Sequence, residues 1–143
     1  MPGKILIIVS QFNELITKLL LEGALDELKN LGIKDDAINV VKTPGCFEIP
    51  TIAAAGARSA KYQSIICLGA IIQGETPHFD FVCQQTAAGI MQVGFNYTIP
   101  TIFGIITTHN NEQALARCGI KGGNKGREAA KTAIEMISTL KKI

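Results

Sequence analysis

The sequence has little charge. Asp, Glu, Lys and Arg make up 18% of its 143 residues, against about 25% in an average globular protein. The charged side chains are scattered, with no block of like charges and no basic stripe interleaved with aromatic residues. Because nucleic-acid-binding surfaces are built from such patches, a nucleic acid is not an expected partner.

Long apolar runs and paired cysteines are also missing. The longest apolar run near the start, Ile5 to Val9, is far shorter than the roughly 20 residues that span a bilayer. No secretory signal precedes the cysteines, whose spacing suits neither a zinc ribbon nor a C-x-x-C redox pair. These cysteines are Cys46, Cys67, Cys83 and Cys118. We therefore expect a soluble, cytoplasmic protein with reduced thiols and no membrane partner.

Several motifs of common chemistries are absent. The sequence has no G-x-x-x-x-G-K-[ST] loop, no G-x-G-x-x-G after its first predicted strand and no G-x-S-x-G elbow. Those two nucleotide-binding modes and that hydrolase design are therefore excluded. His78 and Asp80 offer two metal ligands, but no third His or Cys stands at a familiar spacing, so no metal site is expected.

Apolar side chains are abundant: they make up 47% of the sequence, and the mean hydropathy is +0.25. The length is that of one ordinary domain, so we expect a single domain covering residues 1–143. A parallel sheet buried on both faces would account for part of the apolar excess. Buried contacts between subunits would account for the rest.

Short β-branched runs alternate with longer segments of helical period, a pattern typical of βαβ units and a mostly parallel sheet. The four predicted strands are Lys4–Ser10, Ala37–Thr43, Ser64–Ile71 and Thr101–Thr108. Asn110 and Gln113 resemble a capping box for a helix that ends at Gly119. A last amphipathic helix is predicted from about Arg127 to Lys142.

Two of the predicted helices have apolar faces that we assign from spacing. The helix after the first strand is expected to bury Leu15, Leu19, Ala24 or Leu25, and Leu28. The helix after the third strand is expected to bury a single stripe of Phe79, Val82, Cys83, Ala87, Ile90, Met91 and Gly94.

Polar segments follow all four predicted strands: "QFNE", "TPGCFEIP", "GAIIQGETPHFD" and "THNNEQ". In an open parallel sheet, ligands bind beyond the carboxyl ends of the strands. Glu48 stands between Phe47 and Ile49, where a carboxylate needs a partner or a shifted pKa. His78 lies where proton transfer to a ligand is plausible. The later "KGGNKG" loop, with three nearby cations, could cradle an anion.

Each of these features also has a purely structural interpretation. Phe12 and Phe47 could be core or lid packing, and His78 could be a turn or capping histidine. The "KGGNKG" loop could simply connect two helices. Taken one at a time, the segments leave these alternatives open.

Taken in order, the segments closely resemble the motif series of the lumazine synthase family. The resemblance rests on "QFN", "PGCFEIP", "GAIIQGETPHFD", and "FGIITT" followed by "EQALARCGIKGGNKGREAA", over essentially the whole chain. It implies a three-layer α/β/α flavodoxin-like fold with a central four-stranded parallel sheet. It also implies a transferase of riboflavin biosynthesis that uses no metal and no organic cofactor. The reaction would condense 5-amino-6-(D-ribitylamino)uracil with 3,4-dihydroxy-2-butanone 4-phosphate to 6,7-dimethyl-8-ribityllumazine, releasing phosphate and water.

By resemblance, each motif has an expected role. Phe12 would stack on the pyrimidine, with Asn13 beside it. The pyrimidine and ribityl groups would be held by Cys46, Phe47 and Glu48, and the edge of the pyrimidine would be lined by Ala70, Ile71 and Ile72. Glu75 and Thr76 would lie nearest the phosphate of the second substrate, which Arg117 would bind, and His78 would transfer protons.

The resemblance also implies assembly. Phe103, Lys121 and Lys125 match positions that reach the site from a neighbouring subunit, so self-association into homopentamers is expected. The short "GIKGGNKG" loop favours a 60-subunit icosahedral capsid, whereas an early start of the chain, without the N-terminal strand of many relatives, argues against it. Riboflavin synthase is a further expected partner.

Three residues depart from the family pattern. Gln11 and Gln73 stand where cationic residues are common, and His109 stands where an acidic residue is common. Two rival functions remain open at this point. One is a flavin- or lumazine-binding storage shell without catalysis, and the other is a plain flavodoxin-like module that binds an anion. Arg117, Lys121 and His78 speak against the first, because a binder of the finished ring needs no phosphate site. Tight binding of flavin mononucleotide without turnover would favour either rival.

Overall fold

A computed structural model describes residues 3–119 and 122–143. Strands and helices alternate along it, as the hydropathy pattern predicts. Their order is β1 (Lys4–Ser10), α1 (Glu14–Asn30), β2 (Ile38–Thr43), α2 (Ile49–Arg58), β3 (Tyr62–Ile72), α3 (His78–Tyr97), β4 (Thr101–Thr108), α4 (Asn111–Ala116) and α5 (Lys125–Leu140). Short 3₁₀ turns at Asp35–Ala37 and Cys46–Glu48 precede β2 and α2.

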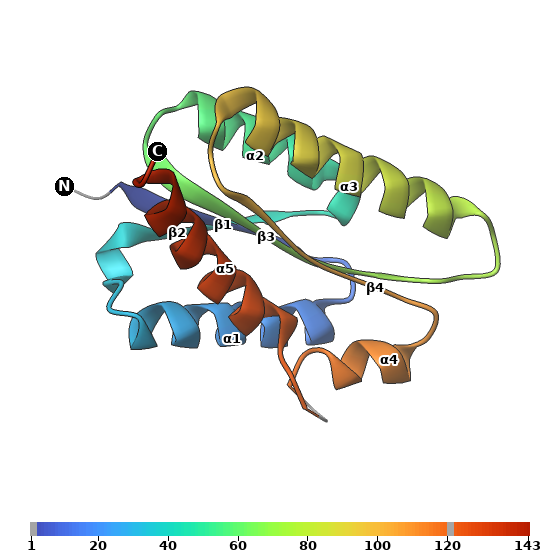
Figure 1. Ribbon diagram of the computed structural model, residues 1–143. Helices are drawn as coiled ribbons and strands as arrows, with labels where there is room; N and C mark the ends of the chain where they lie inside the picture. Colours follow the sequence, from blue (N-terminus) through green and yellow to red (C-terminus); the bar gives the residue numbers. More distant parts are fainter. Residues whose placement is uncertain (1–2, 120–121) are drawn as a thin grey trace.

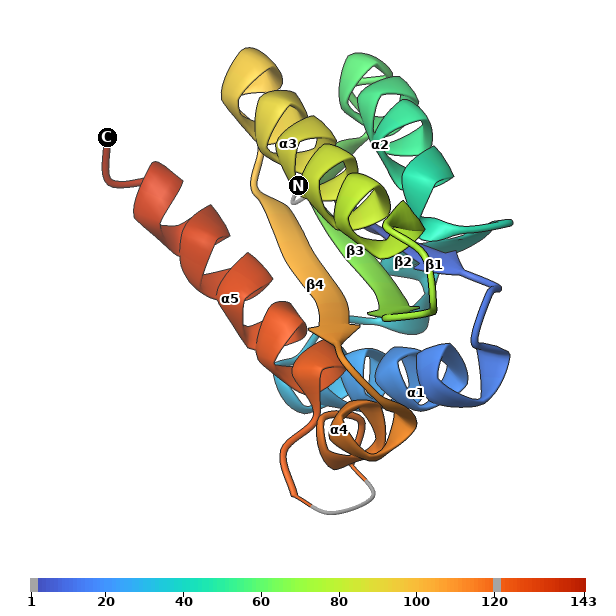
Figure 2. The same ribbon diagram turned by 90° about the vertical axis from the view of Figure 1, so that its right-hand side faces the viewer.

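The four strands form one parallel sheet in the order β2-β1-β3-β4. Helices α1 and α5 cover one face and α2 and α3 cover the other (Figures 1 and 2). The predicted three-layer, flavodoxin-like α/β/α fold is therefore confirmed. Within the described residues, no helix combines the length and apolar character needed to cross a membrane.

The central strands are apolar on both faces. In β1, Ile5 and Ile7 face α1 and α5, whereas Leu6 and Ile8 face α2 and α3. Each face is a separate apolar cluster, which explains why β1 and β3 are almost continuously hydrophobic. Strand β2 differs because it lies at the edge of the sheet, where Val41 is exposed.

The predicted face of α1 is partly wrong. Leu15 is 73% exposed, and Leu19 is only partly buried. The inner face instead contains Ile16, Leu20, Ala24 and Leu28. The helix has leucines on both sides, and spacing alone assigned Leu15 and Leu19 to the core in place of Ile16 and Leu20, one position further along.

The predicted stripe on α3 is also partly wrong. Ala87 is exposed and Met91 is 72% exposed. The residues of α3 that are buried are Thr86, Ile90 and Val93. A second apolar face therefore points away from the sheet, with Phe81, Met91 and Phe95 exposed on it.

The helix caps near the carboxyl end are close to the prediction. The Asn110 side chain accepts from the backbone N–H of Gln113 at 2.8 Å, but the Gln113 side chain reaches back to the N–H of His109. Helix α4 ends at Ala116, before Gly119, and α5 begins at Lys125, before Arg127. The cap of α5 is Asn124, whose side chain accepts from Arg127 N–H at 3.1 Å.

We expect Cys67 to make the stability of the fold sensitive to alkaline pH. Burial raises the pKa of its thiol, and the nearby Cys46 raises it further. Above the unfolded pKa of about 8.5, the unfolded chain therefore ionises a thiol that the folded chain keeps neutral.

We expect the free energy of unfolding to fall as pH rises above about 9, by up to about 1.4 kcal/mol per pH unit for this thiol. Urea unfolding at pH 7, 9 and 10 measures it. The variant Cys67→Ala should lose stability less steeply over the same interval. Equal slopes in the two proteins would show that Cys67 does not carry the effect.

Candidate active site

The first pocket lies beyond the carboxyl ends of β1 and β3, beside the start of α3, where the sequence predicted a ligand site. Its volume is about 640 Å³. Three separate parts of the chain contribute to it, one after each of β1, β2 and β3. Its lining is Phe12, Asn13, Gly45, Cys46, Phe47, Glu48, Ala70, Ile71, Ile72, Gly74, Thr76, His78, Phe79, Phe81 and Val82.

The segment after β1 is held in place by its backbone. Gln11 N–H donates to the Thr43 carbonyl at 2.8 Å, and Phe12 N–H donates to the Pro44 carbonyl at 3.1 Å. Asn13 has a left-handed backbone (φ 64°), and its side chain donates to the Ala70 carbonyl at 3.1 Å. Asn tolerates this conformation better than most residues. These bonds leave the Phe12 ring 70% exposed at the pocket, as a stacking platform requires.

The "CFE" turn packs against β3 through Cys46. A Cβ on Gly69 would lie 2.4 Å from the Cys46 sulfur, so the close approach depends on that glycine. Burial raises the Cys46 pKa, and the thiol donates to the Ser10 hydroxyl. Cys46 is therefore a neutral packing group, and its backbone is what it can offer a ligand.

Phe47 and Glu48 project outward from the same turn. The Phe47 ring is 56% exposed, and Glu48 is exposed as well. The predicted apolar setting of Glu48 is therefore wrong within this chain. Its carboxylate is instead available to a polar ligand group such as a hydroxyl.

His78 is the first residue of α3 and is exposed at the pocket. Its backbone N–H donates to the Thr76 hydroxyl at 3.4 Å. Glu75 is exposed in the same loop but does not line the pocket. The imidazole is therefore available at the pocket, where it can exchange protons with a bound ligand.

Two of the three departures from the family pattern are in contact. The Gln73 side-chain oxygen meets Nδ1 of His109, and the Gln73 N–H donates to the Thr108 carbonyl. The His109 ring also lies against Phe79, with ring centroids 6.0 Å apart. The loop after β3, which carries His78, is thereby joined to the end of β4.

A second pocket, of about 360 Å³, lies at the free edge of β4. It is lined by Phe103, Ile105, Ile106, Thr107, Arg117, Lys125 and Glu128. None of these residues lines the first pocket. Arg117 thus lies with Phe103 and Lys125, apart from Thr76 and His78, and Lys121 falls outside the described residues.

The second pocket is suited to an anion. The Arg117 guanidinium donates to the Gln113 carbonyl at 2.8 Å, and Lys125 N–H donates to the Arg117 carbonyl at 2.8 Å. Within the described residues, no ion pair joins Arg117 or Lys125 to a carboxylate. Two cations against the single Glu128 leave this pocket net positive.

Sequence reasoning missed several lining residues. Phe79 and Val82 were assigned to the core stripe of α3, although both reach the first pocket, and Phe81 was not singled out. All three lie in "GETPHFDFVC", within one helical turn of His78. Their closeness to His78 on one helix is the signal that could have found them. The described residues contain no group of three or more His, Cys, Asp and Glu side chains arranged as metal ligands.

Comparison with known proteins supplies the family. Residues 2–141 match the family model for 6,7-dimethyl-8-ribityllumazine synthase. A protein of that name from Protochlamydia amoebophila (strain UWE25) is 57% identical over 135 residues, which cover 94% of this chain and 78% of the relative. The chain belongs to the lumazine synthase family. As a lumazine synthase it is a transferase, and its reaction is the condensation of the ribitylaminouracil with the butanone phosphate in riboflavin biosynthesis.

Proposed function

We propose that the two pockets are complementary halves of one active site, completed when neighbouring copies of the chain meet. The observation that carries this proposal is the separation of the predicted site residues into two sets with no shared member. The second pocket lies along β4, whose outer edge pairs with no strand in the described chain. An unpaired sheet edge beside an exposed aromatic ring is a natural surface for another subunit.

The first pocket is proposed to hold 5-amino-6-(D-ribitylamino)uracil. The pyrimidine stacks on Phe12, the backbone from Ala70 to Ile72 meets its edge, and the Cys46–Glu48 turn holds the ribityl hydroxyls. A planar, polar heterocycle suits one exposed ring flanked by backbone hydrogen-bonding groups. His78, at the mouth of this pocket, transfers protons between the two substrates.

The second pocket is proposed to bring the phosphate of 3,4-dihydroxy-2-butanone 4-phosphate to the same place. Arg117 offers a planar fork that matches phosphate, and Lys125 adds a second cation. Phe103 closes the cavity over the pyrimidine, and Glu75 and Thr76 of the neighbouring chain approach the phosphate. Lys121 belongs to this set by its motif.

The chemistry requires mainly proximity. An aromatic amine and a ketone condense to an imine with loss of one water, phosphate is then eliminated, and the ring closes as the second amine attacks the remaining carbonyl and a second water leaves. Holding both substrates in one cavity converts this into an intramolecular process. Arg117 stabilises the charge on the departing phosphate, and His78 moves the protons that each step requires.

The assembly we propose is a homopentamer in the cytoplasm, twelve of which form a 60-subunit shell, with riboflavin synthase as a partner. A closed ring gives every chain a neighbour on each side, so each copy both receives and donates a half-site. The exposed apolar face of α3, with Phe81, Met91 and Phe95, supports burial against another chain.

Mixed assemblies test the shared site. We expect His78→Ala and Arg117→Ala chains, unfolded and reassembled together in equal amounts, to recover about one quarter of the wild-type rate, because that fraction of interfaces pairs two intact halves. Each variant reassembled alone should remain slow. The measurement is lumazine fluorescence, together with the mass of the assembly in solution.

A matched control mixes wild-type chains in equal amounts with chains that carry both His78→Ala and Arg117→Ala. If the halves belong to different chains, about one quarter of the sites are intact, whereas sites contained within one chain would leave about half active. Recovery of half the rate in this control, with none in the complementing mixture, would refute the shared site. A monomeric mass would refute it as well.

A further inference from the structure

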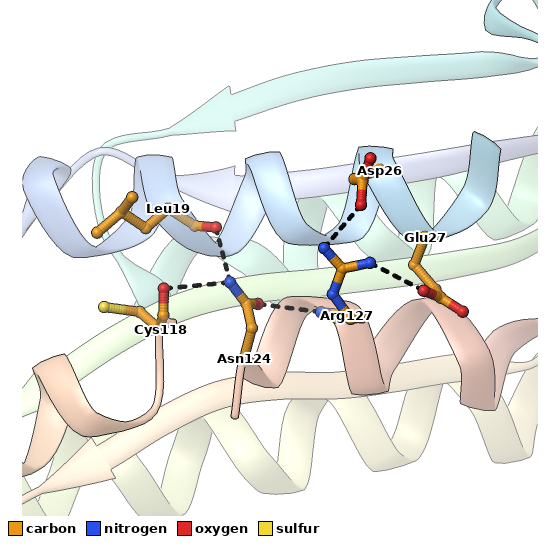
Figure 3. Close-up of polar contacts among 6 residues, drawn as sticks. All are labelled: Leu19, Asp26, Glu27, Cys118, Asn124 and Arg127. Carbon is orange, nitrogen blue, oxygen red and sulfur yellow. Dashed lines mark hydrogen bonds and ion pairs between the residues drawn. The ribbon is translucent and has the colours of Figure 1, made fainter. Parts of the chain in front are cut away.

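Three segments of the chain meet at the side chain of Asn124 (Figure 3). Its oxygen accepts from the backbone N–H of Arg127 at 3.1 Å, which caps α5. Its nitrogen donates to the carbonyl of Leu19 in α1 and to the carbonyl of Cys118 just after α4, both at 3.1 Å. The oxygen and the nitrogen of this one amide thus connect α5, α1 and the segment after α4.

These bonds close the base of the loop that carries the cations of the second pocket. Cys118 and Asn124 form an isolated antiparallel bridge, and Lys125 N–H donates to the Arg117 carbonyl at 2.8 Å. Gly119 N–H donates to the Gly123 carbonyl at 3.1 Å. The backbones of Arg117 and Lys125 are therefore neighbours, although seven residues separate them in sequence.

The start of α5 is also held tightly against α1. A Cβ on Gly126 would lie 1.9 Å from the Leu20 carbonyl oxygen, and one on Gly23 would lie 2.4 Å from the Asn124 side chain. Further along, the Arg127 guanidinium contacts Asp26 at 2.7 Å and Glu27 at 2.9 Å. The close packing at Gly126 and Gly23 fixes the start of α5 against α1, and Asn124 connects the cation loop to that point, whereas the Arg127 ion pairs add stability further along the helix.

We propose that Asn124 is a positioning residue for the phosphate of the second substrate. Its amide donors hold Arg117 and Lys125 at the spacing that one phosphate group requires. This inference rests on the proposed function of the second pocket. The amide is chemically suited to the role, because Asn offers an acceptor and two donors, whereas Asp lacks the donors and Ser keeps only one.

The decisive variant is Asn124→Ser. Serine is a good N-cap, so α5 should keep its cap while the bonds to Leu19 and Cys118 are lost. We expect the KM for the butanone phosphate to rise about tenfold, the cost of about one or two hydrogen bonds at a preorganised site. The KM for the ribitylaminouracil should change less than about twofold, and the inhibition constant of inorganic phosphate should rise in parallel with the first KM.

Two control variants separate positioning from stability. Arg127→Ala removes the contacts with Asp26 and Glu27 but leaves the backbone hydrogen bond between Arg117 and Lys125, so it should lower the unfolding temperature without changing either KM. Asn110→Ser alters the cap of α4 in the same way and tests the effect of a cap substitution alone. An Asn124→Ser enzyme that is only less stable, or whose two KM values rise equally, would overturn the proposal.

Parallel measurement of Arg117→Ala distinguishes the positioning role of Asn124 from the proposal that the second pocket binds the phosphate. If Arg117→Ala leaves the KM for the butanone phosphate unchanged, the phosphate assignment fails and the role of Asn124 fails with it. If that KM rises in Arg117→Ala but not in Asn124→Ser, only the positioning role is overturned. Should Asn124→Ser fail to fold, Asn124→Asp keeps the cap and places a carboxylate against both carbonyls, and the same rise in KM is expected.

Discussion

We expect Arg117→Ala to raise the KM for the butanone phosphate about 100-fold while the KM for the ribitylaminouracil stays within about threefold. The substitution removes a charge-assisted fork to a phosphate, whose loss costs roughly 2–5 kcal/mol in a closed site. The pyrimidine pocket is lined by other residues and should be unaffected. Steady-state lumazine formation, with each substrate varied in turn, measures both values.

A matched control for this prediction is Arg117→Lys. It retains the positive charge but loses the planar fork, so its KM should fall between those of wild type and Arg117→Ala. Both variants remove the guanidinium that donates to the Gln113 carbonyl. A difference between their KM values therefore reports the effect of the positive charge and not the loss of that hydrogen bond. An unchanged KM in Arg117→Ala would place the phosphate elsewhere.

His78→Ala should lower kcat about 10- to 100-fold without reducing it to the uncatalysed rate. Proton transfer by a positioned side chain contributes about 100- to 10,000-fold in general. A loss at or below the lower end of that range is expected here, because amine and ketone condense unaided once they are held together. The measurement is kcat from lumazine fluorescence, corrected for the spontaneous reaction.

The chain contains a natural control for His78, because its second histidine, His109, contacts Gln73 and Phe79 and does not line the pocket. His109→Ala should retain kcat within about threefold, since it disturbs the loop but not the proton-transfer group. A wild-type rate in His78→Ala would remove His78 from the mechanism. Equal losses in both variants would assign the effect to the loop.

The strands were the most predictable part of the fold. The bounds of β1 and β4 match the prediction because each is a run of β-branched residues that ends at polar residues. The cap at Asn110 was predictable for a similar local reason, since an Asn side chain can reach only the next few N–H groups. Interactions between residues close together in the chain decide these strand bounds and this cap, so they can be predicted from the sequence.

The buried sides of α1 and α3 were less predictable. Both helices carry apolar residues on two sides. In α3, for example, Ile90 is buried against the sheet, whereas Met91 is exposed on the other side of the helix. Periodicity identifies the helix but cannot choose between two apolar sides when a second partner covers one of them. The proposed neighbouring subunit would be that partner.

The sequence by itself determined the parallel α/β architecture and the family, because ordered motifs and hydropathy patterns are properties of the chain. The tertiary structure alone decided that Arg117 and Lys125 lie in one pocket while Phe12 and His78 lie in another. It also brought Asn124 onto Leu19, across 105 positions of sequence. The physical reason is that the carboxyl ends of strands converge in space, whereas the loop between α4 and α5 is placed by packing against α1, which no local pattern encodes.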